Sequence, residues 1–250
     1  MNPAIQFRDV SYRINSTREL LHNLNLEIQS GETLVLLGRS GSGKTTTLKL
    51  INHLLAPSAG EILVNGKSTR DWDVIQLRRG IGYVIQDVGL FPHFTIARNI
   101  GLVPRIENWP EDKIQSRTKE LLHLVGLDSG IATRYPRELS GGQRQRVGVA
   151  RALAADPPIL LMDEPFGALD PITRAELQRE FLALQQRLGK TVVFVTHDLR
   201  EALLLGTRIA FMEAGRLVTV RTPSDFVQSS DPLIAAYVNA FETSPPRGAS

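Results

Sequence analysis

The sequence predicts an α/β fold in which helices cover a parallel sheet and an antiparallel β element flanks it. Apolar runs that are typical of strands buried on both faces recur at Leu34–Leu37, Ile159–Met162 and Thr191–Thr196. Helical periodicity separates these runs, and alternation of strands with helices predicts parallel pairing. An Asn65-Gly66 pair after Glu61–Val64 is a hairpin signal, which predicts the antiparallel part.

The first apolar run leads into a glycine-rich loop, Gly38–Thr45, which reads GRSGSGKT and fits the P-loop pattern G-x-x-x-x-G-K-[ST]. Small residues let its backbone N–H groups point at an anion, and the helix expected from Thr46 to Asn52 aims its N-terminus at the phosphates. Lys44 is expected to reach the β- and γ-phosphates, and the Thr45 hydroxyl to bind Mg²⁺. A glycine turn without function fits this strand-loop-helix context poorly. The nucleotide-binding residues expected here are Gly38, Arg39, Ser40, Gly41, Ser42, Gly43, Lys44, Thr45 and Thr46.

The second apolar run ends in two carboxylates, Asp163 and Glu164, followed by Pro165. Asp163 is expected to bind Mg²⁺ through water, and Glu164 to polarise the attacking water as general base. An acidic pair that merely ends a strand before a turn is the alternative. The P-loop in the same chain favours the catalytic interpretation.

Residues Leu139–Gln143 read LSGGQ and precede an arginine-rich helical segment, Gln143–Ala154. A capping serine before two glycines predicts a second helix N-terminus with backbone donors for phosphate, although SGGQ alone also fits an ordinary helix cap. The LSGGQ segment resembles the ATP-binding subunits of ABC transporters, and the resemblance covers nearly the whole chain. It implies a P-loop NTPase core with a parallel sheet, a flanking antiparallel β element and an inserted helical subdomain.

The same resemblance implies that two copies sandwich two ATP molecules head to tail. The backbone donors of one copy, at Ser140, Gly141, Gly142 and Gln143, would then serve the ATP on the P-loop of the other. Asp170, in the Ala168–Asp170 loop, would cross the dimer interface.

Two further positions match the family pattern. Gln86, after Gly82–Ile85, resembles the glutamine that senses Mg²⁺ and the attacking water and links the site to the membrane partner. His197, after Thr191–Thr196, resembles the histidine that hydrogen-bonds the γ-phosphate. A histidine after a strand is often structural, so the role of His197 follows from the resemblance. The catalytic set is therefore Glu164, His197, Gln86 and Lys44, and the Mg²⁺ set is Thr45, Gln86 and Asp163.

The adenine site departs from the family pattern. Family members commonly carry an aromatic residue where this chain has Ile14, and Tyr12 lies two positions earlier. Strand alternation predicts that both side chains face the same side, so Tyr12 is a candidate for stacking on the base. Tyr12 as a plain strand aromatic is an equal alternative.

The remaining segments complete the expected organisation. Short strands are expected within Ile5–Glu27, and helices within Ile96–Leu127, where Pro110-Glu111 starts one helix and Gly126 closes it. Further strands are expected at Arg208–Met212 and Leu217–Arg221, followed by short helices in Pro223–Phe241. The expected domains are one nucleotide-binding domain of residues 1–242, with its core and β element in 1–87 and 156–242 and its helical subdomain at about 88–155, and a disordered tail of residues 243–250.

Composition and sequence pattern argue against several classes of protein. At 250 residues and 42% hydrophobic, the chain can bury a sizeable core. It has no apolar run of the ~18 residues that a membrane span needs, and its start, MNPAIQFRDV, lacks a signal-peptide pattern, which favours the cytosol. Zero cysteines exclude disulfides and thiolate metal sites. The net charge of +3 is scattered, which favours no nucleic-acid partner, and the basic residues of Gln143–Arg151 are interpreted as one helix face.

Several stretches of the sequence resemble a narrower branch of the family. The stretches IGYVIQDVGLFPHFTIARNI, VPRIENW and FVTHDLREALLLG are similar to the ATPases of quaternary-amine uptake, which import glycine betaine, choline or carnitine. This implies an ATP- and Mg²⁺-dependent importer subunit that works with a second copy, permease subunits and indirectly a solute-binding protein, peripheral at the cytoplasmic face of the inner membrane. Several members carry paired regulatory domains after the ATPase; this chain ends soon after Gly215, so regulation through such domains is expected to be absent.

The segment Gly89–Phe94, here called the aromatic loop, directly follows the Gln86 region. A proline-containing loop with two phenylalanines is poorly suited to bare solvent, so it is predicted to line a groove for a permease helix. A loop folded onto its own helical subdomain is the alternative.

Rival functions remain open on the sequence alone. A soluble ABC ATPase of translation or DNA repair shares the ATP motifs, but such proteins carry two cassettes or long coiled coils, which this sequence does not show. A small-molecule kinase leaves LSGGQ unexplained. An importer for another small solute is the alternative within transporters. A cassette without fused membrane spans favours import over export.

Overall fold

The computed structural model describes residues 3–15, 18–86 and 88–243. The chain divides into two compact units, a first unit of residues 1–70 and 193–250 and a second unit of residues 71–192. The helical subdomain expected at about 88–155 falls within the second unit. The finer domain boundaries stay a prediction.

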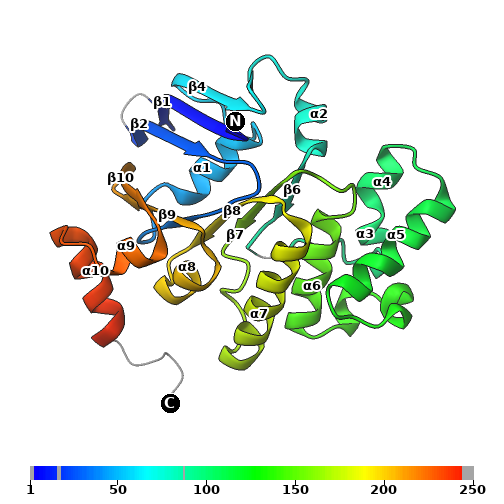
Figure 1. Ribbon diagram of the computed structural model, residues 1–250. Helices are drawn as coiled ribbons and strands as arrows, with labels where there is room; N and C mark the ends of the chain where they lie inside the picture. The colour runs from blue at the N-terminus through cyan, green and yellow to red at the C-terminus, as the bar shows by residue number, and fades with distance from the viewer. Residues whose placement is uncertain (1–2, 16–17, 87, 244–250) are drawn as a thin grey trace. The chain divides into compact units, whose positions relative to one another are not determined.

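The first unit contains the antiparallel sheet that the sequence predicts, with strand order β2-β1-β4-β5. In Figure 1, β1, β2 and β4 lie side by side near the N-terminus, in blue to cyan. Asn65 and Gly66 have φ of 52° and 76°, so both central residues of the β4–β5 turn are left-handed, as a type I′ hairpin turn requires. The strands are β1 (Ile5–Arg13), β2 (Glu19–Ile28), β4 (Ala59–Val64) and β5 (Lys67–Ser68).

Strand β1 does not keep a regular register with β2 to its end. Its pairing with β2 shifts register between Val10 and Tyr12 and again between Tyr12 and Arg13, and β1 stops at Arg13. Ile14 lies in a bend and is 55% exposed, whereas Tyr12 is half-buried. Near Tyr12 the surplus residues of these shifts lie in β2, so the prediction that Tyr12 and Ile14 face the same side stays a prediction.

The first unit also holds the strand that leads into the P-loop. Strand β3 (Thr33–Leu37) is buried at every position and pairs in parallel with β9 (Arg208–Glu213), which forms an antiparallel hairpin with β10 (Arg216–Arg221). Strand β8 (Thr191–Thr196), also buried throughout, neighbours β3 and begins at the end of the second unit. The expected strands after His197 are thus confirmed.

Helices of the first unit follow the expected order. Helix α1 begins at Lys44, two residues before the expected start, because the glycines end at Gly43. The helices are α1 (Lys44–Ile51), α8 (Leu199–Leu205), α9 (Pro223–Val227) and α10 (Pro232–Thr243).

The second unit pairs the buried strand β7 (Ile159–Asp163) in parallel with β6 (Ile81–Val84). The other elements are helical, as predicted for the segment before LSGGQ; α3 to α7 are drawn in green to yellow in Figure 1. They are α2 (Val74–Arg79), α3 (Ile96–Ile100), α4 (Leu102–Ile106), α5 (Glu111–Leu124), α6 (Gly141–Ala152) and α7 (Pro171–Leu188), with short 3₁₀ turns at Ser129–Thr133 and Pro136–Glu138.

Helix α5 shows why this segment is helical. Its buried positions Ile114, Thr118, Leu121 and Leu122 recur at helical spacing and face the unit's core. Pro110 precedes its first turn, and Gly126, with φ of 68°, follows its end, so both expected boundary residues are confirmed.

The expected disordered tail, residues 243–250, lies outside the described residues except for Thr243, the last residue of α10. None of the helices in the described part of the chain combines the length and apolar character that a membrane crossing requires.

Candidate functional site

The P-loop lies in the first unit between β3 and α1. Gly41 and Gly43 have φ of 81° and 100°, a backbone conformation that residues other than glycine rarely adopt. An added Cβ at Gly38 would lie 2.1 Å from the Met212 carbonyl oxygen, whereas one at Gly41 would meet nothing within 4 Å. Glycine is thus needed at Gly38 for packing and at Gly41 for backbone shape, and Gly41 leaves the exposed side of the loop open.

Two polar side chains of the P-loop are buried. Lys44, 4% exposed, donates from Nζ to the carbonyl oxygens of Gly38 and Arg39, both at 2.8 Å. Ser42 Oγ is also buried and has no hydrogen-bond partner among the described residues. Because a buried hydroxyl normally finds a partner, Ser42 fits a loop whose remaining acceptors come from a bound anion.

The other residues expected to bind the nucleotide differ in exposure. Arg39 and Ser40 are exposed, Thr45 and Thr46 are half-buried at the start of α1, and Tyr12 belongs to β1 of the same unit. The first unit therefore carries the P-loop, Tyr12 and His197.

His197 is exposed and directly follows β8. Its backbone carbonyl accepts a hydrogen bond of 2.8 Å from the hydroxyl of Tyr237 on α10. The preceding residue, Thr196, accepts a hydrogen bond at Oγ1 from Asp198 N at 2.9 Å and donates one to buried Glu201 at 2.5 Å. These bonds fix the backbone at His197, and Tyr237 is a supporting residue that the sequence did not indicate because it lies forty positions away.

The two carboxylates lie where β7 ends in the second unit. Asp163 is 5% exposed, and its charge together with burial raises the pKa of Tyr83, on neighbouring β6, to about 12, burial being the larger cause. Glu164 is half-buried and has φ of 43°. A non-glycine residue in this region costs about 1–2 kcal/mol, and such strain gathers at functional sites.

The LSGGQ segment caps α6. Ser140 Oγ accepts from Gln143 N at 3.2 Å, and Gln143 Oε1 accepts from Ser140 N at 3.0 Å, which is a capping box. An added Cβ at Gly142 would lie 2.7 Å from Thr173 Cγ2 on α7, so glycine lets the two segments approach. The predicted second helix N-terminus is confirmed, and it begins at Gly141 rather than Gln143.

Asp170 caps α7 next to this contact. Its carboxylate accepts from Ile172 N at 3.2 Å and Thr173 N at 3.0 Å. Hydrogen bonds, first from the Thr173 side chain, hold the pKa of Asp170 below its usual range. Thr173 thus connects Asp170 to Gly142, and the structure brings the predicted interface loop and the LSGGQ segment together.

Gln86 is exposed and lies two residues beyond β6. The carbonyls of Val88 and Gly89, just after it, accept from the Arg151 guanidinium at 2.6 and 2.7 Å. Burial lowers the pKa of Arg151, which remains charged at neutral pH. Arg151 therefore ties the Gln86 region to α6, the helix that LSGGQ starts.

The aromatic loop is organised by Asn99 of α3, which is fully buried. Asn99 accepts from Phe91 N at 2.8 Å and donates to the carbonyls of Phe91, Phe94 and Thr95 at 3.1–3.2 Å. Phe94 is half-buried beneath the guanidinium of Arg98, 4.0 Å from its ring centre, whereas Phe91 is 40% exposed. The loop packs partly on its own unit and still presents Phe91 outward.

A cavity of about 540 Å³ opens among the helices that follow this loop. Its walls include three cationic side chains, and one of them, Arg105, pairs with Glu111 at 2.8 Å. The cavity is lined among others by Thr95, Arg98, Arg105, Glu111, Ile114 and Lys119.

Comparison with known proteins agrees with this geometry. A family model described as ABC transporter matches residues 21–167. The choline transport ATP-binding protein OpuBA of Bacillus subtilis is 51% identical over 235 residues, 94% of this chain and 62% of that protein. The osmoprotectant import ATP-binding protein OsmV of Salmonella typhimurium is 54% identical over 220 residues, 88% of this chain and 56% of that protein. This chain thus spans less than two thirds of either relative.

The glycine betaine uptake system ATP-binding protein YehX of Escherichia coli is 50% identical over 219 residues, 88% of this chain and 71% of that protein. Among solved structures, a dimeric post-hydrolysis state of the ATP-binding cassette MJ0796 with ADP and Pi is 35% identical, with a TM-score of 0.79 over 88% of this chain and 98% of that one. The structure of cbiO1 from Clostridium perfringens, part of the ABC transporter complex cbiONQ, is 28% identical, with a TM-score of 0.84 over 94% of both chains. This chain belongs to the ABC transporter family and has the α/β fold of its ATP-binding cassettes.

Proposed function

We propose that this chain is the ATP-hydrolysing subunit of an ABC importer that drives a separate membrane permease. The observation that carries the proposal is the P-loop, where Lys44 is held by two loop carbonyls and buried Ser42 Oγ has no hydrogen-bond partner within the described residues. Entering phosphates would give both groups anionic acceptors, and Lys44 would exchange the carbonyls of Gly38 and Arg39 for them. Tyr12 offers a ring for the adenine.

Oxygen ligands suitable for Mg²⁺ are present in both units. Mg²⁺ is commonly held by one or two carboxylates together with substrate phosphates. The Thr45 hydroxyl, the Asp163 carboxylate and the Gln86 side-chain carbonyl are oxygen donors of this kind, and they are our proposed ligands. The ion would neutralise charge on the β- and γ-phosphates.

Hydrolysis is assigned to Glu164 and His197. Glu164, held at an unusual φ directly after a buried strand, is the proposed general base that orients and deprotonates the attacking water. His197, on a turn fixed by Tyr237, is proposed to hydrogen-bond the γ-phosphate.

A second copy of the chain is the proposed partner at the nucleotide. Ser140, Gly141, Gly142 and Gln143 would present backbone donors to the ATP bound by the other copy, and Asp170 would lie at the interface. Ile172, beside Asp170, is 74% exposed, which suits a residue that becomes covered when two copies meet.

The permease is proposed to bind at the aromatic loop and the cavity beside it, where Phe91 is exposed and Arg98, Arg105 and Lys119 surround an opening of about 540 Å³. The chain would then lie at the cytoplasmic face of the inner membrane. The relatives OpuBA, OsmV and YehX are named for choline, osmoprotectants and glycine betaine, so we propose a quaternary amine as the solute, delivered by a separate binding protein.

The experiment is to tag the chain in its native host, solubilise the membranes gently and identify by mass spectrometry what co-purifies. A polytopic permease supports the importer, and its binding protein can then be titrated with betaine, choline and carnitine. Ribosomes, DNA-repair proteins or no membrane protein at all would contradict the transport function but leave ATP hydrolysis to be assayed separately.

A further inference from the structure

We propose that Gly215 is a positioning residue for nucleotide binding: the turn between β9 and β10 holds the P-loop against β2 in the shape that receives phosphates. Gly215 lies outside the matched family region and far from the P-loop in sequence. The inference rests on the proposed function, because it assumes that the P-loop binds ATP.

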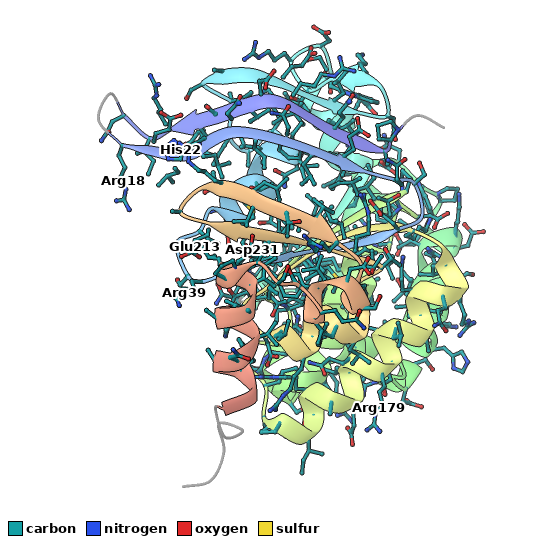
Figure 2. All side chains as sticks on the ribbon, turned by 60° about the vertical axis from the view of Figure 1, so that its left-hand side comes forward. Arg18, His22, Arg39, Arg179, Glu213 and Asp231 are labelled. Carbon is teal, nitrogen blue, oxygen red and sulfur yellow. The ribbon has the colours of Figure 1, made fainter. Side chains whose placement is uncertain are left out.

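Gly215 uses both of its backbone groups as a bridge. Its N–H donates to the carbonyl of Ser42 in the P-loop at 3.2 Å, and its carbonyl accepts from His22 N of β2 at 2.9 Å. Figure 2 labels His22 of β2, Glu213 of β9 and Arg39 of the P-loop along one side of the first unit. One residue thus connects the P-loop, the β9–β10 turn and the antiparallel sheet.

Only glycine fits this bridge. Gly215 has φ of 75°, and an added Cβ would lie 2.4 Å from the carbonyl oxygen of Leu20 and 3.1 Å from His22 Cδ2. The first obstacle is backbone, which cannot rotate away, so a methyl group must push the turn and β2 apart. The bond from Gly215 to Ser42 would lengthen with that movement.

Strands β2 and β9 approach the P-loop at two other points. An added Cβ at Gly43 would lie 2.5 Å from Leu21 Cδ2 of β2, and one at Gly38 would lie 2.1 Å from the carbonyl of Met212 of β9. The P-loop therefore lies in close contact with β2 and the end of β9, and Gly215 joins these two supports. A shift of the turn would change the loop's backbone, whose N–H groups are the proposed phosphate donors.

Gly66 is a matched control within the same unit. It follows Asn65 in the β4–β5 turn as Gly215 follows Ala214, and its φ of 76° nearly equals that of Gly215. An added Cβ at Gly66 meets nothing within 4 Å. Gly66→Ala therefore imposes the same left-handed strain without the clash and without touching the P-loop.

The experiment compares the natural chain, Gly66→Ala and Gly215→Ala by thermal unfolding and by titration with ATP and with ADP in EDTA, at a temperature where all are folded. Gly66→Ala should keep the dissociation constants of the natural chain. Gly215→Ala should weaken both nucleotides by about tenfold or more, because both carry the β-phosphate and small misplacements are costly. In steady-state hydrolysis, its KM should rise more than its kcat falls.

Hydrogen exchange of the natural chain provides a second test that needs no variant. ADP should slow exchange in residues 213–217, where Gly215 N–H meets the P-loop, and leave residues 64–68 unchanged. Equal nucleotide affinities for Gly215→Ala and Gly66→Ala, or no effect of ADP on residues 213–217, would overturn the inference. Failure of the natural chain to bind either nucleotide would instead overturn the proposed function.

Discussion

Replacing Asn99 by Leu should destabilise the aromatic loop more than any other single amide substitution near it. Asn99 is fully buried, accepts one hydrogen bond from the Phe91 backbone and donates to three carbonyls. Leu has the same branching and the same number of side-chain heavy atoms as Asn, so the change removes hydrogen bonds without opening a cavity. The Phe91 backbone would then lose its hydrogen bonds to the side chain of residue 99 on α3.

The magnitude follows from these contacts. A neutral hydrogen bond contributes a net of about 1 kcal/mol, and a buried donor without a partner costs about 1–3 kcal/mol. Asn99 has two N–H donors shared among three acceptors, and Phe91 is 40% exposed, so water can reach part of the freed backbone. We therefore expect a loss of about 3 kcal/mol, which for a chain of this size lowers Tm by roughly 6–12 °C.

The assay is thermal and guanidinium unfolding of Asn99→Leu beside Gln115→Leu. Gln115 is exposed on α5, so losing its amide should change stability by less than about 0.5 kcal/mol. Refutation would come from equal unfolding midpoints for the two variants. The loop would then depend on its aromatic contacts rather than on Asn99.

Two more predictions concern the same unit. Arg151→Met removes the bonds to Val88 and Gly89, and a loss of about 2 kcal/mol should speed amide exchange just after Gln86 by about 30-fold. Arg179, which points outward from α7 in Figure 2, supplies the control Arg179→Met, and similar acceleration in both would contradict the reasoning. Replacing Phe91 and Phe94 by Ser should reduce permease binding and solute-linked transport while nucleotide affinity stays nearly unchanged; a complex that assembles normally but no longer binds ATP would argue against the docking role.

The sequence was most informative where local chemistry decides the structure. The strands β3, β7 and β8 are buried along their whole length, so their apolar runs were sufficient to predict them. The Asn65-Gly66 turn and the Ser140 cap were equally predictable, because left-handed backbone and helix N-termini select particular residues.

Long-range partners could not be predicted from the same patterns. Arg144, Arg146 and Arg151 were interpreted as one basic helix face, yet they donate to Leu139, Val125 and Val88 respectively. Their position on a helix is confirmed, but their carbonyl partners could not be predicted, because spacing along a helix does not show which carbonyls lie near.

The roles of Asn99, Tyr237 and Gly215 were missed for a related reason. Each acts through backbone groups of a distant or adjoining segment, and backbone groups leave no mark on residue type. The β9–β10 turn begins with Ala214, φ of 46°, where Asn or Gly is the usual signal.

The central claim is that two copies of this chain bind ATP between the P-loop of one and the LSGGQ segment of the other. The most direct measurement is the solution mass of Glu164→Gln by light scattering, with and without ATP, beside the same variant carrying Lys44→Ala. We predict that ATP doubles the mass of Glu164→Gln, because ATP binds without being hydrolysed, and that the Lys44→Ala chain keeps its single mass. A Glu164→Gln chain that binds ATP and keeps the mass of one copy would contradict the claim.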